Sequence, residues 1–123
     1  MRKLFIESPG FTDWIKVHLE DDRLASLQRE LSTDPEAGDV MPGCGGLRKI
    51  RIADSRRGKG KRGGIRIIYL HVAEVDVILL LDVYSKTDQQ NLTNDQRRIL
   101  KGMADIYKQT LIQWMGDSRK RKR

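Results

Sequence analysis

The fold is decided by residues 65–84, which read IRIIYLHVAEVDVILLLDVY. Two mainly apolar and β-branched runs, 65–72 and 77–84, flank a Glu-Val-Asp connection at 74–76. Runs of this length and composition are typical of strands in the middle of a sheet. We therefore expect two inner strands here, and the remaining elements are placed relative to them.

The segment before the first run predicts a third strand, at residues 47–52. Ile50 and Ile52 fall on one face of such a strand, and Lys49 and Arg51 fall on the other. This alternation is typical of a strand with one buried face. The exposed face of this strand should therefore be basic.

Apolar residues at helical spacing predict three helices around these strands. Ser8 and Pro9 fit the N-cap and the first position of the first helix, and Pro35 and Gly38 end the second. Residues 93–96, Thr-Asn-Asp-Gln, form a capping-box pattern that begins the last helix. The apolar positions of the three helices are Phe11, Trp14, Ile15, His18 and Leu19; Leu24, Leu27 and Leu31; and Ile99, Leu100, Met103, Ile106, Tyr107, Leu111 and Trp114.

With a short strand at residues 4–6, the element order becomes β-α-α-β-β-β-α. The predicted fold class is α+β, with a small, mostly antiparallel sheet packed on helices. At 123 residues the chain is long enough for one domain and too short for two. We expect that domain to span residues 1–115, followed by a basic disordered tail at 116–123.

Composition and segment lengths exclude several classes of protein. A hydrophobic content of 38% with 33% charged residues fits a globular chain rather than a disordered one. No apolar run approaches the length of about 18 residues that a membrane span needs. Cys44 has no partner for an internal disulfide, and the first residues lack the apolar run of a secretory signal. The expected location is therefore the cytoplasm.

The net charge of +7 is unevenly distributed along the chain. Residues 47–73 contain nine Lys and Arg against one Asp, whereas residues 1–46 contain five against nine Asp and Glu. Within the basic part, residues 54–64 read DSRRGKGKRGG and are expected to form a glycine-rich hairpin loop. Such a concentration of cations fits a polyanionic partner. From charge alone, a merely solvated face explains it equally well.

Several familiar catalytic patterns are absent from the sequence. It has no Ser-His-Asp arrangement, no cluster of metal ligands and no nucleotide-binding loop, so neither a metal nor a cofactor is expected. His18 lies on an apolar helix stripe and His71 near the end of an inner strand, positions that more often belong to core residues than to bases. Cys44 has no neighbouring base and is interpreted as structural.

What remains is a group of cations with a tyrosine nearby. Tyr84 and Lys86 share one face of the last strand, and a tyrosine beside cations can stack on a base. RNA carries its own nucleophile, the 2′-OH, so a surface that positions the scissile nucleotide and stabilises its charge can cleave it. A lysine among like charges can serve as the general base, and Arg66 is better suited to stabilise the transition state.

Four segments resemble the HigB-like branch of the RelE/ParE toxin superfamily: residues 35–40 (PEAGDV), 45–51 (GGLRKIR), 58–69 (GKGKRGGIRIIY) and 84–86 (YSK). The similarity covers residues 3–112. It implies a RelE-like fold and a toxin of a type II toxin–antitoxin system. It further implies cleavage of mRNA in the ribosomal A site by metal-free 2′-OH attack, which inhibits translation. The implied partners are the ribosome, mRNA and a cognate antitoxin, of the helix-turn-helix, HigA-like type.

The resemblance also implies which residues form the site. By position, it assigns catalytic roles to Lys49, Arg51, Arg66, Tyr84 and Lys86. The remaining cations of the hairpin are expected to bind RNA: Arg48, Arg56, Arg57, Lys59, Lys61 and Arg62. Two alternatives stay open. Some members of the superfamily act on DNA gyrase with the same fold, and a non-catalytic RNA- or ribosome-binding module would carry a similar basic surface.

Overall fold

The structure, a computed structural model, describes residues 3–18, 21–52, 65–85 and 92–121. In chain order its elements are β1 (Leu4–Glu7), α1 (Pro9–His18), α2 (Asp21–Thr33), β2 (Asp39–Val40), β3 (Arg48–Ile52), β4 (Ile65–Val72), the 3-10 turn η3 (Ala73–Val75), β5 (Val77–Ser85) and α3 (Asn94–Arg121). This order confirms the predicted α+β pattern. The structure adds the two-residue strand β2 and the turn η3 to it.

The strands form one five-stranded sheet in the order β1-β5-β4-β3-β2. β1 runs parallel to β5, and the other three pairs are antiparallel. The two runs within residues 65–84 are therefore the inner strands β4 and β5, and the sheet is mostly antiparallel, as predicted. β3 and β4 are neighbours in the sheet, so Lys49, Arg51 and Arg66 of the basic stretch lie on adjacent strands.

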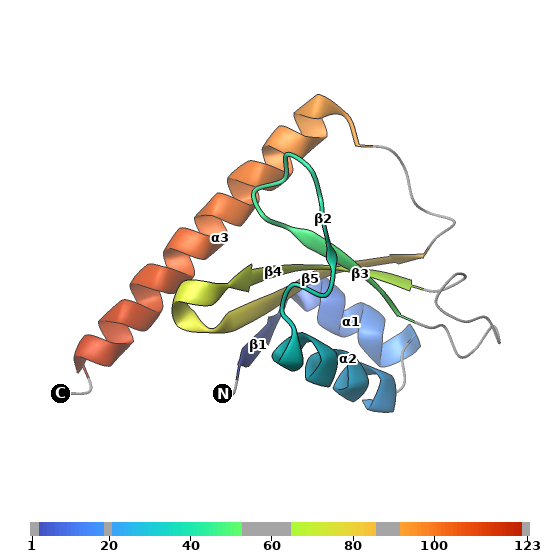
Figure 1. Cartoon of the computed structure of the whole chain (residues 1–123), viewed down its shortest axis with the longest axis horizontal. Helices are drawn as coiled ribbons and strands as arrows, with labels where there is room; N and C mark the ends of the chain where they lie inside the picture. Colours follow the sequence, from blue (N-terminus) through green and yellow to red (C-terminus); the bar gives the residue numbers. More distant parts are fainter. Residues whose placement is uncertain (1–2, 19–20, 53–64, 86–91, 122–123) are drawn as a thin grey trace.

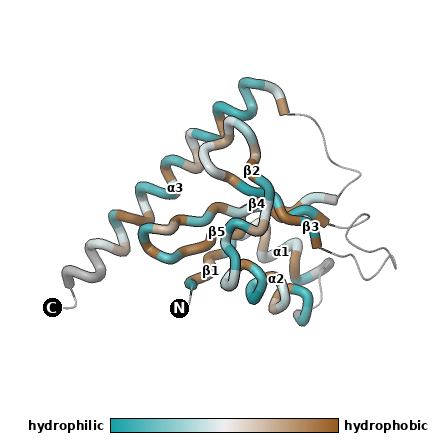
Figure 2. Tube along the Cα trace, viewed as in Figure 1, coloured by the Kyte–Doolittle hydropathy of each residue, from teal (hydrophilic) through white to brown (hydrophobic). Residues whose placement is uncertain are grey.

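Helices cover both faces of this sheet (Figure 1). α1 and α2 pack on one face, called here the α1/α2 face, and α3 crosses the opposite face, called the α3 face. The core of the α1/α2 face includes Phe11, Ile15, Leu27, Leu31, Ile50, Ile52, Ile67, Tyr69, Ile78 and Leu80. The core of the α3 face includes Met41, Cys44, Leu47, Leu70, Val72, Val75, Val77, Leu79 and Ala104. The strong hydrophobicity of β4 and β5 in Figure 2 follows, because both of their faces are covered.

Two helix starts are held by the side chains that the sequence indicated. The Phe11 backbone N–H donates to Ser8 Oγ at 3.1 Å, which caps α1. At α3, the Gln96 N–H donates to Thr93 Oγ1 at 3.1 Å, and the Thr93 N–H donates to Gln96 Oε1 at 2.8 Å. This reciprocal pair is a capping box, as predicted.

The other end of α3 differs from the prediction. The helix runs to Arg121, so residues 116–121 continue it instead of forming part of a disordered tail. Each residue added to an existing helix gains a backbone hydrogen bond, which favours its extension into these residues. Within the described chain, no helix is long and apolar enough to cross a membrane.

The loop between β2 and β3 supports the first half of α3. Gly45 has a φ of +72°, and a Cβ there would lie 3.1 Å from Ala104 Cβ and 3.1 Å from the Lys101 carbonyl oxygen. The Arg97 guanidinium donates to the Pro42 carbonyl at 3.2 Å. Further along, α3 contacts β4 and η3. α3 is thus placed over the end of β4 that leads into η3, and Arg66 lies near the other end of that strand.

Candidate functional site

Three neighbouring strands place Arg51, Arg66 and Tyr84 side by side. Arg51 of β3 is opposite Arg66 of β4, and Arg66 is opposite Tyr84 of β5. Directly opposed residues in antiparallel strands point to the same face, with Cβ atoms roughly 5 Å apart. We call these three residues the Arg-Arg-Tyr row. It brings together three of the five residues to which a catalytic role was assigned.

A β-bulge in β5 sets the direction of Tyr84. Ile68 pairs with Asp82 while Tyr69 pairs with Leu80, so Leu81 is an extra residue without a partner in the ladder. An uninterrupted strand would put Tyr84 on the same face as Leu80, in the core of the α1/α2 face. The extra residue reverses the alternation and turns Tyr84 to the face of Arg66.

Ser8 holds this bulge from the far end of the chain. Its hydroxyl donates to the Leu81 carbonyl oxygen at 2.7 Å, while Ser8 Oγ itself accepts from the Phe11 N–H. A bulge frees a backbone carbonyl from the ladder, and a buried carbonyl needs another donor. The N-cap of α1 therefore also supports the strand geometry that directs Tyr84.

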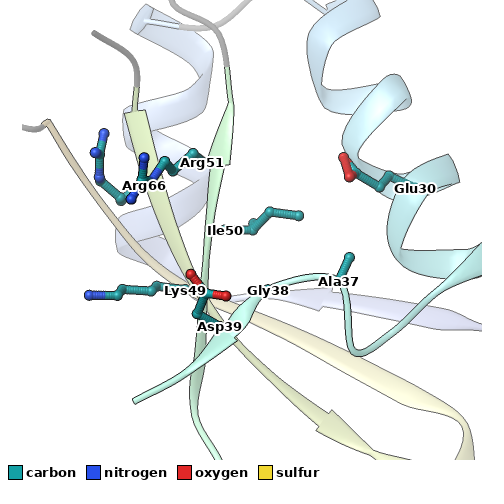
Figure 3. A pocket seen from close by; sticks show the side chains of 8 residues that line it. All are labelled: Glu30, Ala37, Gly38, Asp39, Lys49, Ile50, Arg51 and Arg66. Atoms are coloured by element: carbon teal, nitrogen blue, oxygen red, sulfur yellow. The ribbon is translucent and has the colours of Figure 1, made fainter. Parts of the chain in front are cut away.

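A second row lies one step along the strands, on the same face. It consists of Asp39, Lys49, Ile68 and Asp82, paired in that order across β2, β3, β4 and β5. Two residues along a strand span roughly 6.6 Å, so Lys49 lies about that far from Arg51. Figure 3 shows Lys49, Arg51 and Arg66 pointing to the same side of the sheet. Lys49 thus lies one step from the Arg-Arg-Tyr row, with Asp39 opposite it on β2.

Arg66 and Tyr84 are both partly removed from water. Arg66 is only 5% exposed, which restricts its guanidinium to few orientations. Burial raises the pKa of Tyr84 above 10.0, and the positive charges of Arg66 and Arg51 oppose that rise. Its phenol is consequently protonated at neutral pH and can donate a hydrogen bond to a phosphate oxygen.

A hollow of about 280 Å³ opens at the β3 edge of the sheet, next to the row. β2 pairs only with Arg48 and Lys49, so the rest of this edge is bordered by the α2–β2 segment. The residues that line the hollow are Glu30, Ala37, Gly38, Asp39, Lys49, Ile50, Arg51 and Arg66 (Figure 3). Both arginines of the row therefore contribute to the wall of this hollow.

Arg48 lies apart from these cations. It is opposite Tyr69 in the register, which places its side chain on the α1/α2 face. Its guanidinium donates to the carbonyl oxygens of Gly38, at 2.8 Å, and Glu36, at 3.4 Å. Period-two alternation already groups Arg48 with Ile50 rather than with Arg51, so the sequence carried this information.

The family of the chain follows from a comparison with family models. The model described as "RelE toxin of RelE / RelB toxin-antitoxin system" matches residues 5–121. The chain belongs to the RelE toxin family. The fold agrees: a double arginine-to-alanine mutant of the Escherichia coli toxin RelE, in the free state, is similar with a TM-score of 0.50 at 21% identity. That likeness covers 72% of this chain and 86% of the E. coli chain.

Several residues singled out from the sequence of this RelE-family chain lie outside the described residues. They are Lys86 of the catalytic group and Arg56, Arg57, Lys59, Lys61 and Arg62 of the RNA-binding group. The side chain of His18, at the end of α1, is also not described.

The other two titratable candidates are remote from the row. His71 is five residues from Arg66 along β4, on the order of 16 Å, and faces the opposite side. Burial and the positive charge of Lys3 lower its pKa below 6.5. Cys44 is buried under α3. Of the site residues assigned from the sequence of this RelE-family toxin, the described part of the chain brings Lys49, Arg51, Arg66 and Tyr84 close together.

Sequence reasoning missed the role of Tyr69. This side chain is fully buried, yet its hydroxyl accepts from Gly38 N–H at 2.9 Å and donates to the Pro35 carbonyl at 2.8 Å. It therefore holds the segment that borders the hollow. The available signal was chemical: a buried tyrosine hydroxyl requires a partner, and only the fold reveals which one.

Proposed function

We propose that this RelE-family chain is a ribosome-dependent mRNA endoribonuclease that inhibits translation in the cytoplasm. The proposal rests above all on one observation, the Arg-Arg-Tyr row with Lys49 beside it. Two guanidinium groups and a protonated phenol on one sheet face suit a phosphate with a base next to it. The HigB-like segments support the same activity, with a helix-turn-helix, HigA-like antitoxin as the neutralising partner.

The proposed reaction needs no covalent bond to the protein and no metal. The 2′-oxygen attacks the adjacent phosphorus and loses its proton, and the bond to the 5′-oxygen breaks. The 5′-oxygen takes up a proton, which leaves a 2′,3′-cyclic phosphate and a 5′-OH. Arg66 and Arg51 stabilise the negative charge on the phosphorane, which builds up in the transition state.

Tyr84 is proposed to stack on the base beside the scissile phosphate and to donate its O–H. Lys49 and Lys86 complete the group, as cations that can also transfer a proton. The basic hairpin residues Arg56, Arg57, Lys59, Lys61 and Arg62 are proposed to bind the RNA backbone. Arg48, directed to the other face, is proposed to support the hollow instead of contacting RNA.

Mapping transcript 5′ ends after induced expression tests this function. We expect new 5′ ends within coding regions, and we expect Arg66→Ala and Tyr84→Ala each to reduce cleavage at least about 100-fold, as loss of a preorganised donor does. Circular dichroism should show both variants folded. Full toxicity of both variants would contradict the mechanism. Intact transcripts with gyrase-linked DNA breaks would instead indicate the gyrase-directed activity known in the superfamily.

A further inference from the structure

A second hollow, of about 150 Å³, lies between α3 and the sheet, and we call it the α3 hollow. Its lining is mainly apolar and consists of Ser8, Leu47, Ile68, Leu81, Asp82, Leu100, Met103, Ala104 and Tyr107. Among these residues, Tyr107 supplies an aromatic ring and Asp82 supplies the charge. An apolar cavity of about 150 Å³ accepts a ring the size of benzene. The α3 hollow therefore suits a flat six-membered ring with one polar edge directed at Asp82.

The α3 hollow adjoins the Arg-Arg-Tyr row. Ile68 follows Arg66 by two residues on β4, and on β5 the spacing is the same between Asp82 and Tyr84. Two residues along a strand span roughly 6.6 Å and point to the same face, so the hollow begins one such step from the row. A phosphate held by the two arginines has a ribose and base on each side of it. Tyr84 is proposed to stack on one of these bases, and the α3 hollow is placed to receive the other.

Asp82 determines which base the α3 hollow favours. Its Oδ1 accepts from the Val83 N–H at 2.8 Å, which restricts the orientation of the carboxylate. An ionised carboxylate only accepts hydrogen bonds. The exocyclic amino groups of cytosine, adenine and guanine can donate to it, whereas uracil has carbonyl oxygens on both sides of its N3–H. A carboxylate near an RNA backbone repels it, so a donor on the base is needed to offset the repulsion.

Tyr107 offers a surface on which the same base can stack. Its side chain lines the α3 hollow and is 37% exposed, and Met103, one turn earlier on α3, lines the hollow as well. Stacking of an unpaired base on an aromatic ring depends little on which base it is. Tyr107 would therefore contribute affinity, and Asp82 would contribute selectivity.

We propose that the α3 hollow binds one of the two bases beside the scissile phosphate, and that Asp82 selects a base with an exocyclic amino group over uracil. The inference rests on the proposed function, which supplies RNA as the ligand. Cytosine would enter with its whole ring, and a purine with its six-membered ring. Asp82 takes no part in the breaking of the bond, so its replacement changes which RNA is cleaved rather than whether RNA is cleaved.

The experiment compares Asp82→Asn with Asp105→Asn. Both changes replace an exposed carboxylate by an amide of the same shape, and Asn at position 82 keeps an oxygen for the Val83 N–H, but Asp105 does not line the α3 hollow. Fluorescence anisotropy measures binding of oligocytidine and oligouridine of equal length. We expect the wild type and Asp105→Asn to bind oligocytidine about tenfold more tightly, as one well-placed base contact does. Asp82→Asn should bind both oligonucleotides alike.

Two further measurements separate selectivity from affinity. In mapped transcript 5′ ends, uracil should be depleted beside the cuts made by the wild type, and the depletion should disappear with Asp82→Asn. Tyr107→Ala should weaken the binding of both oligonucleotides about tenfold, the size of effect that loss of one stacking contact has. Tyr107→Phe keeps the ring and should bind as the wild type does.

Equal affinity of the wild type for the two oligonucleotides, or an unchanged preference in Asp82→Asn, would overturn the proposal. So would a Tyr107→Ala variant that binds both oligonucleotides normally but loses affinity for a protein partner, because a protein side chain would then occupy the α3 hollow. If the wild type cleaves no transcript, the proposed function fails. The oligonucleotide comparison does not depend on cleavage and still decides whether the α3 hollow selects an amino-bearing base.

Discussion

At the scale of single residues, Tyr69 shows how one hydroxyl shapes the site. It links Gly38 and Pro35, in the segment after α2, to the central strand β4. Gly38 makes this possible, since a Cβ there would come within 2.7 Å of the Tyr69 ring and 2.8 Å of the Lys49 carbonyl oxygen. The segment that borders the hollow at the β3 edge is thus held in position by a glycine and a tyrosine, neither of which carries a charge.

Replacing Tyr69 by Phe tests this link. The change leaves the Gly38 N–H and the Pro35 carbonyl without their partner, and an unsatisfied buried polar group costs about 1–3 kcal/mol. We expect a corresponding loss of unfolding free energy in urea titrations. Tyr107→Phe, on the exposed side of α3, is the control and should change stability by less than about 0.5 kcal/mol. Equal stability of the two variants would contradict the structural role of Tyr69.

At the scale of elements, the first half of the long helix α3 contacts the β2–β3 loop, and several of its apolar side chains are exposed. Gly45 lets the β2–β3 loop approach its backbone closely. Gly102, in contrast, lies in the middle of the helix, and a Cβ there would meet nothing within 4 Å outside the helix backbone. The two glycines therefore have opposite consequences for the stability of the isolated chain.

We expect Gly102→Ala to stabilise the chain by up to about 1 kcal/mol, because alanine loses less backbone entropy in a helix. Gly45→Ala should destabilise it by about 1 kcal/mol or more, since its φ of +72° disfavours a side chain and its Cβ would crowd Ala104. Thermal and chemical unfolding measure both. A destabilising Gly102→Ala would mean that the helix needs this glycine for reasons within the chain.

At the scale of the whole molecule, three cations of the described chain, Lys49, Arg51 and Arg66, lie with Tyr84 on one face of the sheet. The helices α1 and α2 cover the other face. An RNA strand should therefore bind on one side of the molecule only. The salt dependence of binding reports how many phosphates that side contacts.

Binding of a single-stranded RNA oligonucleotide, followed by fluorescence anisotropy at several salt concentrations, checks this. Removing two phosphate contacts with Lys49→Met and Arg51→Met should reduce the slope of log K against log salt by about 1.4, near 0.7 per contact. The matched control, Lys16→Met with Arg29→Met, removes two exposed charges from α1 and α2. An equal change of slope in the control would indicate binding over the whole surface.

The sequence by itself determined most of the elements of this protein. The inner strands, the caps at Ser8 and Thr93, and the basic outer face of β3 all depend on residues close together in the chain. Strand periodicity and helix caps can for that reason be predicted from the sequence alone. The family, too, was visible in short segments of sequence.

Only the tertiary structure decided which residues meet. Strand alternation alone would have sent Tyr84 into the core, and the bulge at Leu81, supported by Ser8, turned it to Arg66. The tertiary structure likewise divided the apolar residues of α3 into a set packed on the sheet and an exposed set. Both outcomes depend on pairing and packing between segments that are distant in the chain. The periodicity within one segment cannot predict them.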